Sequence, residues 1–128
     1  MTKTFIKNNG AFPLSKAVLH DEKYTMELSG QIGMNSETGK LAEGIEKQTI
    51  QTLENINNIL NSVKWNLSNI IKVRIYLSDM ENYAKMNEIY SRYFKKDHPA
   101  RVALAVKELP SKALIEIECV ACGDKINN

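Results

Sequence analysis

The sequence predicts a single α+β domain over residues 1–128, in which two helices cover one face of a mixed six-stranded sheet. Two segments, 43–63 and 79–96, repeat apolar residues every three or four positions, as amphipathic helices do. Shorter segments alternate apolar and polar residues, as strands do. Two of these, 69–77 and 101–106, flank the second helical segment. This order indicates parallel strands joined by a helix that packs on the sheet.

The composition excludes several classes of protein. The 128 residues are 43% hydrophobic, enough for one core, and the net charge of +2 gives no strong nucleic-acid or membrane signature. Neither a run of about 18 apolar residues nor an N-terminal signal core is present, so we expect a cytoplasmic protein with no membrane partner. Cys119 and Cys122 have the spacing of half a zinc site, but no second pair follows. We interpret both as ordinary thiols and expect no metal.

The N-terminal third predicts three short strands and a loop that contains glycine. Segments 2–7, 16–20 and 23–29 have the pattern of strands in a hairpin or meander. Ser29 and Gly30 then open a loop that ends in a cluster of turn residues at 35–39. Gly30 either lets the backbone approach a ligand or serves a bend in the strand, and the sequence leaves both readings open.

The second helix carries an unusual polar residue on its apolar stripe. Ser78 and Glu81 have the spacing of a capping box at its start, and Asn87 interrupts the stripe one or two turns later. Burying an unpaired amide costs roughly 1–3 kcal/mol, so Asn87 should be hydrogen-bonded. We therefore expect Asn87 to brace the sheet edge or a site.

The segment 98–122 carries the side chains best suited to chemistry. It reads as two strands joined by a turn at residues 110–111, with Glu116 and Glu118 on one face of the second. On the first strand we expect the buried face to hold Val102, Leu104 and Val106. The opposite face should carry the charge, with Arg101, Ala103 and Ala105. Arginine can grip a carboxylate at two points, and a glutamate can transfer a proton or orient a water. The same pattern also fits an Arg101 paired with an acid and glutamates that face solvent.

The sheet face away from the helices predicts an oligomer. We expect this face to be half apolar, with Tyr76, Ala103, Ala105 and Val120 beside Arg101 and Glu116. An open face of this kind usually marks an interface. We therefore expect a homo-oligomer with any site at the subunit boundary.

Six segments taken together resemble one known family. They are S-G-Q-I-G-M-N-S-E-T-G-K-L at 29–41, Q-T-I-Q-T-L-E-N-I-N-N-I-L at 48–60, I-I-K-V-R-I-Y-L-S-D-M at 70–80, M-N-E-I-Y at 86–90, P-A-R at 99–101 and L-P-S-K-A-L-I-E-I-E at 109–118. Their order and spacing resemble those of the RidA/YjgF family of small deaminases that act on reactive intermediates. The resemblance covers nearly the whole chain, and it is specific in combination although no single segment is.

The resemblance implies a homotrimer with a chorismate-mutase-like fold, in which the sheets form a central barrel with the helices outside and clefts between subunits. It implies that Arg101 holds the substrate carboxylate and that Glu116 positions or activates the hydrolytic water. Ser29 and Gly30 would line the pocket, with Asn87 near it. The implied reaction converts imines or enamines such as 2-iminobutanoate and 2-aminoacrylate to a 2-keto acid and ammonia, with no cofactor.

Two departures from the family pattern leave alternatives open. Leu14 stands where the family's deaminases usually carry a tyrosine, and Ala103 stands where they often carry a cysteine. We expect retained imine hydrolysis with a shifted substrate preference or a lower rate. Leu14 also favours a non-catalytic trimer that binds a small carboxylate. RNA cleavage is a third activity attached to this family. The net charge of +2 gives this activity little support, and the two histidines, His20 and His98, are far apart in the chain.

Overall fold

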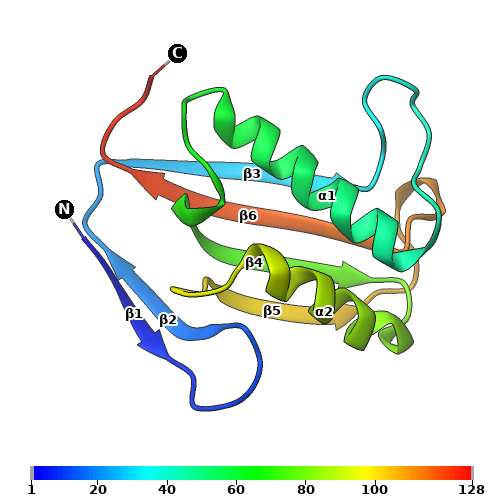
Figure 1. The fold of residues 1–128 in the computed structure, drawn as a ribbon, viewed down its shortest axis with the longest axis horizontal. Helices are drawn as coiled ribbons and strands as arrows, with labels where there is room; N and C mark the ends of the chain where they lie inside the picture. The colour runs from blue at the N-terminus through cyan, green and yellow to red at the C-terminus, as the bar shows by residue number, and fades with distance from the viewer. Residues whose placement is uncertain (1, 128) are drawn as a thin grey trace.

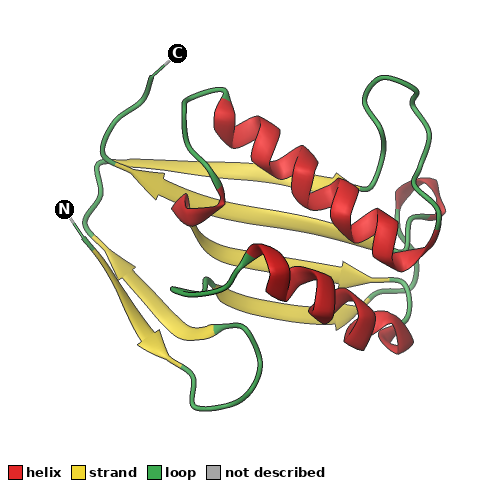
Figure 2. Cartoon of the chain, viewed as in Figure 1, coloured by secondary structure: helices red, strands yellow, loops and turns green. Residues whose placement is uncertain are grey.

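The computed structural model describes residues 2–127 and confirms the α+β arrangement. Helices α1 (Gly44–Asn61) and α2 (Tyr83–Tyr93) pack beside each other on one face of the sheet (Figure 1, Figure 2). The strands are β1 (Lys3–Lys7), β2 (Ser15–His20), β3 (Tyr24–Ile32), β4 (Ile70–Leu77), β5 (Ala100–Ala105) and β6 (Ile115–Gly123). Their order across the sheet is β1-β2-β5-β4-β6-β3.

The pairing of the strands confirms the central prediction and corrects a peripheral one. β4 and β5 are parallel with α2 between them in sequence, as predicted, and β6 is antiparallel to both β4 and β3. β1 and β2 form a hairpin that meets β5 at one residue pair, Ser15 with Ala100, and then turns away from the sheet (Figure 1). The meander alternative is wrong, because β3 pairs with β6, where Leu28 lies opposite Cys119 and both side chains enter the core.

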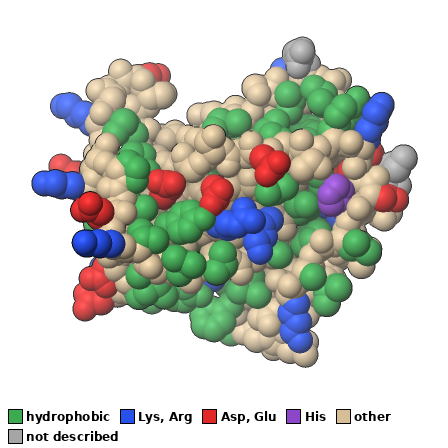
Figure 3. Space-filling model, turned by 180° about the vertical axis from the view of Figure 1, so that it is seen from behind, with side chains coloured by type: hydrophobic (Ala, Val, Ile, Leu, Met, Phe, Trp, Pro, Cys, Tyr) green, Lys and Arg blue, Asp and Glu red, His purple; other side chains and the backbone are tan. Residues whose placement is uncertain are grey.

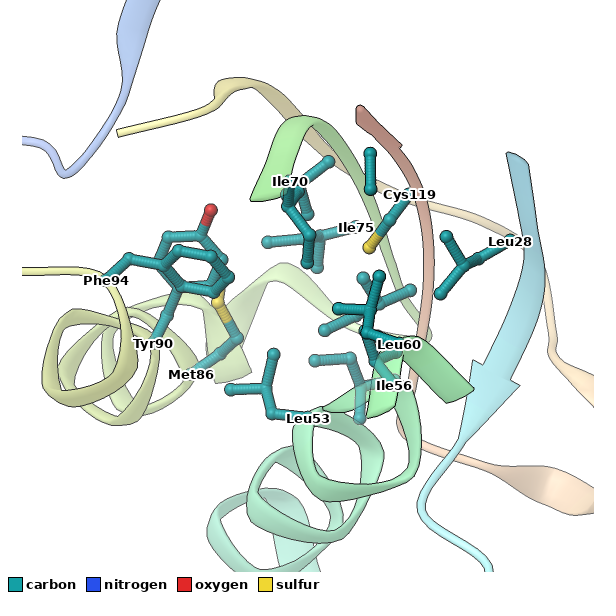
Figure 4. Close-up of a cluster of buried hydrophobic side chains, with 14 of the residues drawn as sticks. Leu28, Leu53, Ile56, Leu60, Ile70, Ile75, Met86, Tyr90, Phe94 and Cys119 are labelled. Carbon is teal, nitrogen blue, oxygen red and sulfur yellow. The ribbon is translucent and has the colours of Figure 1, made fainter. Parts of the chain in front are cut away.

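The core lies between the helices and the central strands. Alternate residues of β4 are fully buried, and they meet the apolar stripes of both helices (Figure 4). The fully buried side chains include Val73, Ile75, Leu77, Leu53, Ile56, Leu60 and Met86. Each contributes roughly 1.5–3 kcal/mol relative to an exposed position. Trp65 is buried, and its Nε1 donates to the carbonyl of Lys125 at 2.7 Å.

The start and the end of α2 differ from the prediction. The capping box of Ser78 and Glu81 is wrong, because Asp79 caps a short 3-10 turn (Met80–Asn82) and accepts a hydrogen bond from the Glu81 backbone at 2.8 Å. The α-helix therefore begins only at Tyr83. It ends at Tyr93 and not near residue 96, since Phe94 leaves the helical conformation and stacks on Tyr90 with ring centroids 4.4 Å apart.

The two faces of β5 are the reverse of those predicted. Val102 and Leu104 are 38% and 40% exposed on the open face of the sheet. Arg101 and Ala103 lie opposite Val73 and Ile75 of β4, on the face that the helices cover. The reversal has a physical cause: α2 offers hydrogen-bond acceptors to the guanidinium, and a shift of one residue would turn every side chain of β5 to the other face.

Candidate functional site

Arg101 is held by one face of α2. Its Nη1 donates to Asn87 Oδ1 at 2.7 Å, and its Nη2 donates to the Tyr83 hydroxyl at 2.8 Å. The guanidinium also lies 4.8 Å from the ring centroid of Tyr90 and 5.8 Å from that of Tyr83. Two hydrogen bonds and two ring contacts thus fix the position of a half-buried cation.

The partners of Arg101 are all uncharged. Among residues 2–127, no carboxylate forms an ion pair with its guanidinium. The cation therefore keeps its full charge, and those of its N–H donors that do not reach Asn87 or Tyr83 stay available. A preorganised arginine without an acidic partner is suited to bind an anion such as a carboxylate. The alternative in which Arg101 pairs with an acid does not describe this arrangement.

Asn87 has the hydrogen-bonded role expected of it, and two tyrosines join it. Tyr83, Asn87 and Tyr90 follow one another at helical spacing and all face Arg101. Tyr83 and Tyr90 were not predicted as site residues, because aromatic residues on an apolar stripe are typical of a core. The useful signal was Asn87 itself, since a polar residue on a stripe indicates that its helical neighbours also face a polar group.

Leu14 and Ala103 both lie near Arg101, the first through strand pairing and the second along β5. Ser15, which follows Leu14, pairs with Ala100, which precedes Arg101. Leu14 is half-buried and lines a cavity of about 570 Å³ between the β1–β2 loop and the end of α2. Ala103 lies two residues beyond Arg101 on the same face and packs against the core.

Glu116 lies on the other face of the sheet, above Gly30. β3 bulges between Leu28 and Gln31, and Ser29 and Gly30 form the exposed bulge. A Cβ added at Gly30 would lie 2.2 Å from Glu116 Oε2, so the carboxylate occupies the space that a side chain would need. Gly30 therefore serves a bulge, as one reading predicted, and leaves room for the Glu116 carboxylate; approach of the backbone to a ligand stays a prediction.

The two glutamates of β6 differ in their surroundings. Glu118 accepts a hydrogen bond from the Tyr76 hydroxyl, and this bond raises the pKa of Tyr76 above its ordinary value of 10.0. Glu116 accepts no side-chain hydrogen bond within the part of the chain that the structure describes. Glu118 is therefore engaged in the sheet, whereas Glu116 is free to meet a ligand or a water.

Arg101 and Glu116 lie on opposite faces of the sheet. Arg101 is paired with Val73, which is buried under the helices, whereas Glu116 is paired with Tyr76 on the open face. Seen from behind, this open face carries apolar side chains around a group of cations and acids (Figure 3). The structure therefore brings Arg101 together with Asn87, and Glu116 together with Gly30, but it does not unite the two groups within one chain.

Comparison with known proteins identifies the fold and the family. A family model described as "Endoribonuclease L-PSP" matches residues 7–122. A protein of Aquifex aeolicus described as a RutC family protein is 50% identical over 73% of this chain and 77% of its own length. The human protein named 2-iminobutanoate/2-iminopropanoate deaminase is 41% identical over 85% of this chain and 79% of its own length. The chain belongs to the RidA/YjgF family.

Solved structures agree with this family membership. A putative endoribonuclease from Thermotoga maritima has a TM-score of 0.75 at 37% identity, and the match covers 94% of this chain and 98% of that one. RidA from an Antarctic Psychrobacter also has a TM-score of 0.75, at 32% identity over 91% of each chain. The two helices on a six-stranded mixed sheet are thus the arrangement of this family.

Two ionisable side chains on the helix-covered side of the sheet, Cys119 and Tyr90, are buried. Burial raises the pKa of the Cys119 thiol from 9.0 to about 12, and burial also raises the pKa of Tyr90 well above 10.0. Both groups are protonated at neutral pH and serve packing. Within residues 2–127, no cluster of three or more His, Cys, Asp or Glu side chains is placed to hold a metal, and none of the helices there is long and apolar enough to cross a membrane.

Proposed function

We propose that this protein is an imine and enamine deaminase that hydrolyses 2-iminobutanoate, 2-iminopropanoate and related small acids to 2-keto acids and ammonia. The observation that carries the proposal is the guanidinium of Arg101, which Asn87 and Tyr83 hold with neutral oxygens and which keeps its charge for a carboxylate. Relatives that carry the name of this deaminase, at 36–41% identity, support the choice of substrate.

The proposed reaction is the addition of water across a carbon–nitrogen bond. A water oxygen attacks the imine carbon, which is already electrophilic, and the nitrogen accepts a proton to give a carbinolamine. The carbinolamine hydroxyl then gives its proton to the nitrogen, the carbon–nitrogen bond breaks as the carbon–oxygen double bond forms, and ammonia leaves. Glu116 is the group that accepts the proton from water and returns it to the nitrogen, so the balance of protons is zero and no cofactor is needed.

The opposite placement of Arg101 and Glu116 supports a site shared between two copies of the chain. Val102 and Leu104 are exposed on β5, and beyond Ala100 this strand has no partner on its outer edge among the described residues. An apolar edge strand of this kind favours association with another chain. We propose a cyclic homotrimer in which the Arg101 corner of one copy faces the Glu116 surface of the next.

The other predicted site residues fit this division. Asn87, Ala103 and Leu14 would belong to the half-site of Arg101, and Ser29 and Gly30 to that of Glu116. In this proposal Leu14 gives the pocket an apolar wall and Ala103 leaves room beside the arginine. The substrate would be a small acid with an alkyl side chain, because Arg101 would hold its carboxylate and Leu14 would contact its alkyl group.

The test is an assay of imine hydrolysis in which a dehydratase or an amino-acid oxidase generates the substrate and semicarbazide traps what remains. Wild type should accelerate loss of the imine, and Arg101→Ala should lower kcat/KM by about 100-fold or more, because a charge-assisted carboxylate contact is lost. Lys85→Ala is the matched control. This lysine is on the same helix and exposed, and its side chain does not line the hollow beside Tyr83 and Asn87.

Leu14 favours a second function, that of a small-carboxylate-binding protein without turnover, because leucine cannot donate a hydrogen bond to substrate or water. The same assay separates the two functions. Binding of 2-oxobutanoate that depends on Arg101, with no acceleration of hydrolysis by a correctly assembled wild type, would replace the deaminase proposal with the binding function.

A further inference from the structure

Tyr83 lies at the start of α2, one helical turn before Asn87, and its hydroxyl is bonded to Arg101. Its ring makes an edge-to-face contact with Phe12, with centroids 5.9 Å apart, and the residue is half-buried. Tyr90, the other phenol beside the arginine, is fully buried. Of the two, only Tyr83 is exposed enough to reach a bound molecule.

The direction of the hydrogen bond leaves the phenolic proton of Tyr83 unused. A guanidinium has donors but no acceptor, so Arg101 donates and the Tyr83 oxygen accepts. The O–H of Tyr83 then points to another acceptor, and among residues 2–127 no acceptor is bonded to it. A donor directly beside a cation is well placed to contact the anion that the cation binds.

A hollow lies beside the two residues that hold the arginine, although Arg101 itself does not line it. Phe12, Tyr83, Ala84, Asn87, Glu88 and Ser91 line a hollow of about 430 Å³. Its one acid, Glu88, pairs with Arg92 at 3.2 Å, which offsets its charge. The hollow therefore has a phenol and an amide at the side of Arg101 and no uncompensated negative charge to repel a carboxylate.

We infer that Tyr83 is a substrate-binding residue whose hydroxyl donates a hydrogen bond to the same carboxylate that Arg101 holds. The inference rests on the proposed function and extends it, since it assigns a second contact to the acid group of the substrate. Because the carboxylate does not change during the reaction, this contact acts equally on the bound substrate and on the transition state. Its loss should raise KM and leave kcat nearly unchanged.

The experiment compares Tyr83→Phe with wild type in the imine assay and in calorimetric binding of 2-oxobutanoate. Tyr83→Phe keeps the ring against Phe12 and removes only the hydroxyl. We expect about a tenfold increase in KM and in the Kd for 2-oxobutanoate, with kcat within about twofold of wild type. Tyr93→Phe is the matched control, because Tyr93 is on the same helix, is half-buried and makes no contact with Arg101; both of its constants should stay at the wild-type values.

The two assays distinguish failure of the inference from failure of the proposed function. If wild type hydrolyses the imine and Tyr83→Phe matches it in KM and Kd, Tyr83 does not contact the carboxylate, while the deaminase proposal stands. If wild type binds 2-oxobutanoate with the expected dependence on Tyr83 but hydrolyses nothing, the binding inference stands and the deaminase proposal fails. A wild type that neither binds 2-oxobutanoate nor hydrolyses the imine overturns both.

Discussion

Arg101 and Glu116 occupy opposite faces of one sheet, and their side chains differ in how many hydrogen bonds fix them. Asn87 and Tyr83 fix the arginine with two hydrogen bonds, so its position is set before any ligand arrives. The glutamate rests above Gly30 and accepts no side-chain bond in the described part of the chain. The first arrangement is suited to binding, and the second, with a carboxylate free to exchange protons, is suited to catalysis.

The largest expected effect is a loss of kcat on substitution of Glu116. Comparison with the same substitution at Glu118 tests whether the open face is catalytic. Glu116→Gln should lower kcat by about 100-fold or more, because the amide cannot accept a proton from water. Glu118→Gln should keep kcat within about threefold, since Glu118 is engaged by Tyr76 and the amide oxygen can still accept that bond. The measurement is the imine assay at saturating substrate. Equal losses for both variants would show that the two carboxylates act together.

Gly30→Ala should have an intermediate effect on the same face. The new methyl group would lie 2.2 Å from Glu116 Oε2, so the carboxylate must move while the bulge of β3 can persist. We expect kcat to fall by about tenfold with little change in KM, because the arginine half-site is untouched. Gly10→Ala is the control, since its Cβ would meet only the flexible side-chain amide of Asn8 at 3.1 Å. Full activity of a folded Gly30→Ala protein would show that the Glu116 carboxylate takes no part in the reaction.

The smallest expected effect is on the pH dependence of the free energy of unfolding. It comes from two buried groups on the helix-covered face of the sheet. The folded protein keeps Cys119 and Tyr90 protonated, whereas the unfolded chain ionises them near their ordinary pKa values of 9.0 and 10.0. Their raised pKa values therefore contribute stability that is fully present below pH 9 and is lost as pH rises through the folded values. Urea unfolding at fixed protein concentration should show a loss of about 1–2 kcal/mol between pH 8 and pH 10.

Cys119→Ala tests the cause of this loss. The variant should have a shallower fall in unfolding free energy just above pH 9, because its unfolded chain no longer releases that proton. An unchanged slope would show that Cys119 does not govern the pH dependence.

The sequence predicted the central fold because its periodicities are local and strong. The apolar stripes of α1 and α2 and the alternation in β4 and β6 depend on neighbouring residues, and each appears in the predicted segment, although α2 is shorter at both ends. The family resemblance assigned Arg101, Asn87, Glu116 and Gly30 to one pocket, and within one chain the structure brings together only Arg101 with Asn87 and Glu116 with Gly30.

The faces of β5 could not be predicted in the same way. Alternation shows that two sets of residues face opposite sides, but it does not say which side the helices cover. Val102 and Leu104 were expected to be buried because they are apolar, yet the hydrogen bonds of Arg101 to α2 place the arginine on the covered face. That contact depends on the long-range position of a helix, and this also explains why the role of Tyr83 was not predicted.

The central claim is that one active site combines Arg101 of one copy with Glu116 of another. It is tested by mixing two inactive variants, Arg101→Ala and Glu116→Gln, after joint unfolding and refolding so that their subunits exchange. In a cyclic oligomer with random mixing, about one quarter of the sites would receive an intact arginine and an intact glutamate, so the mixture should recover about one quarter of wild-type activity. A mixture that exchanges subunits but recovers no activity would contradict the account, because both groups would then have to come from the same copy.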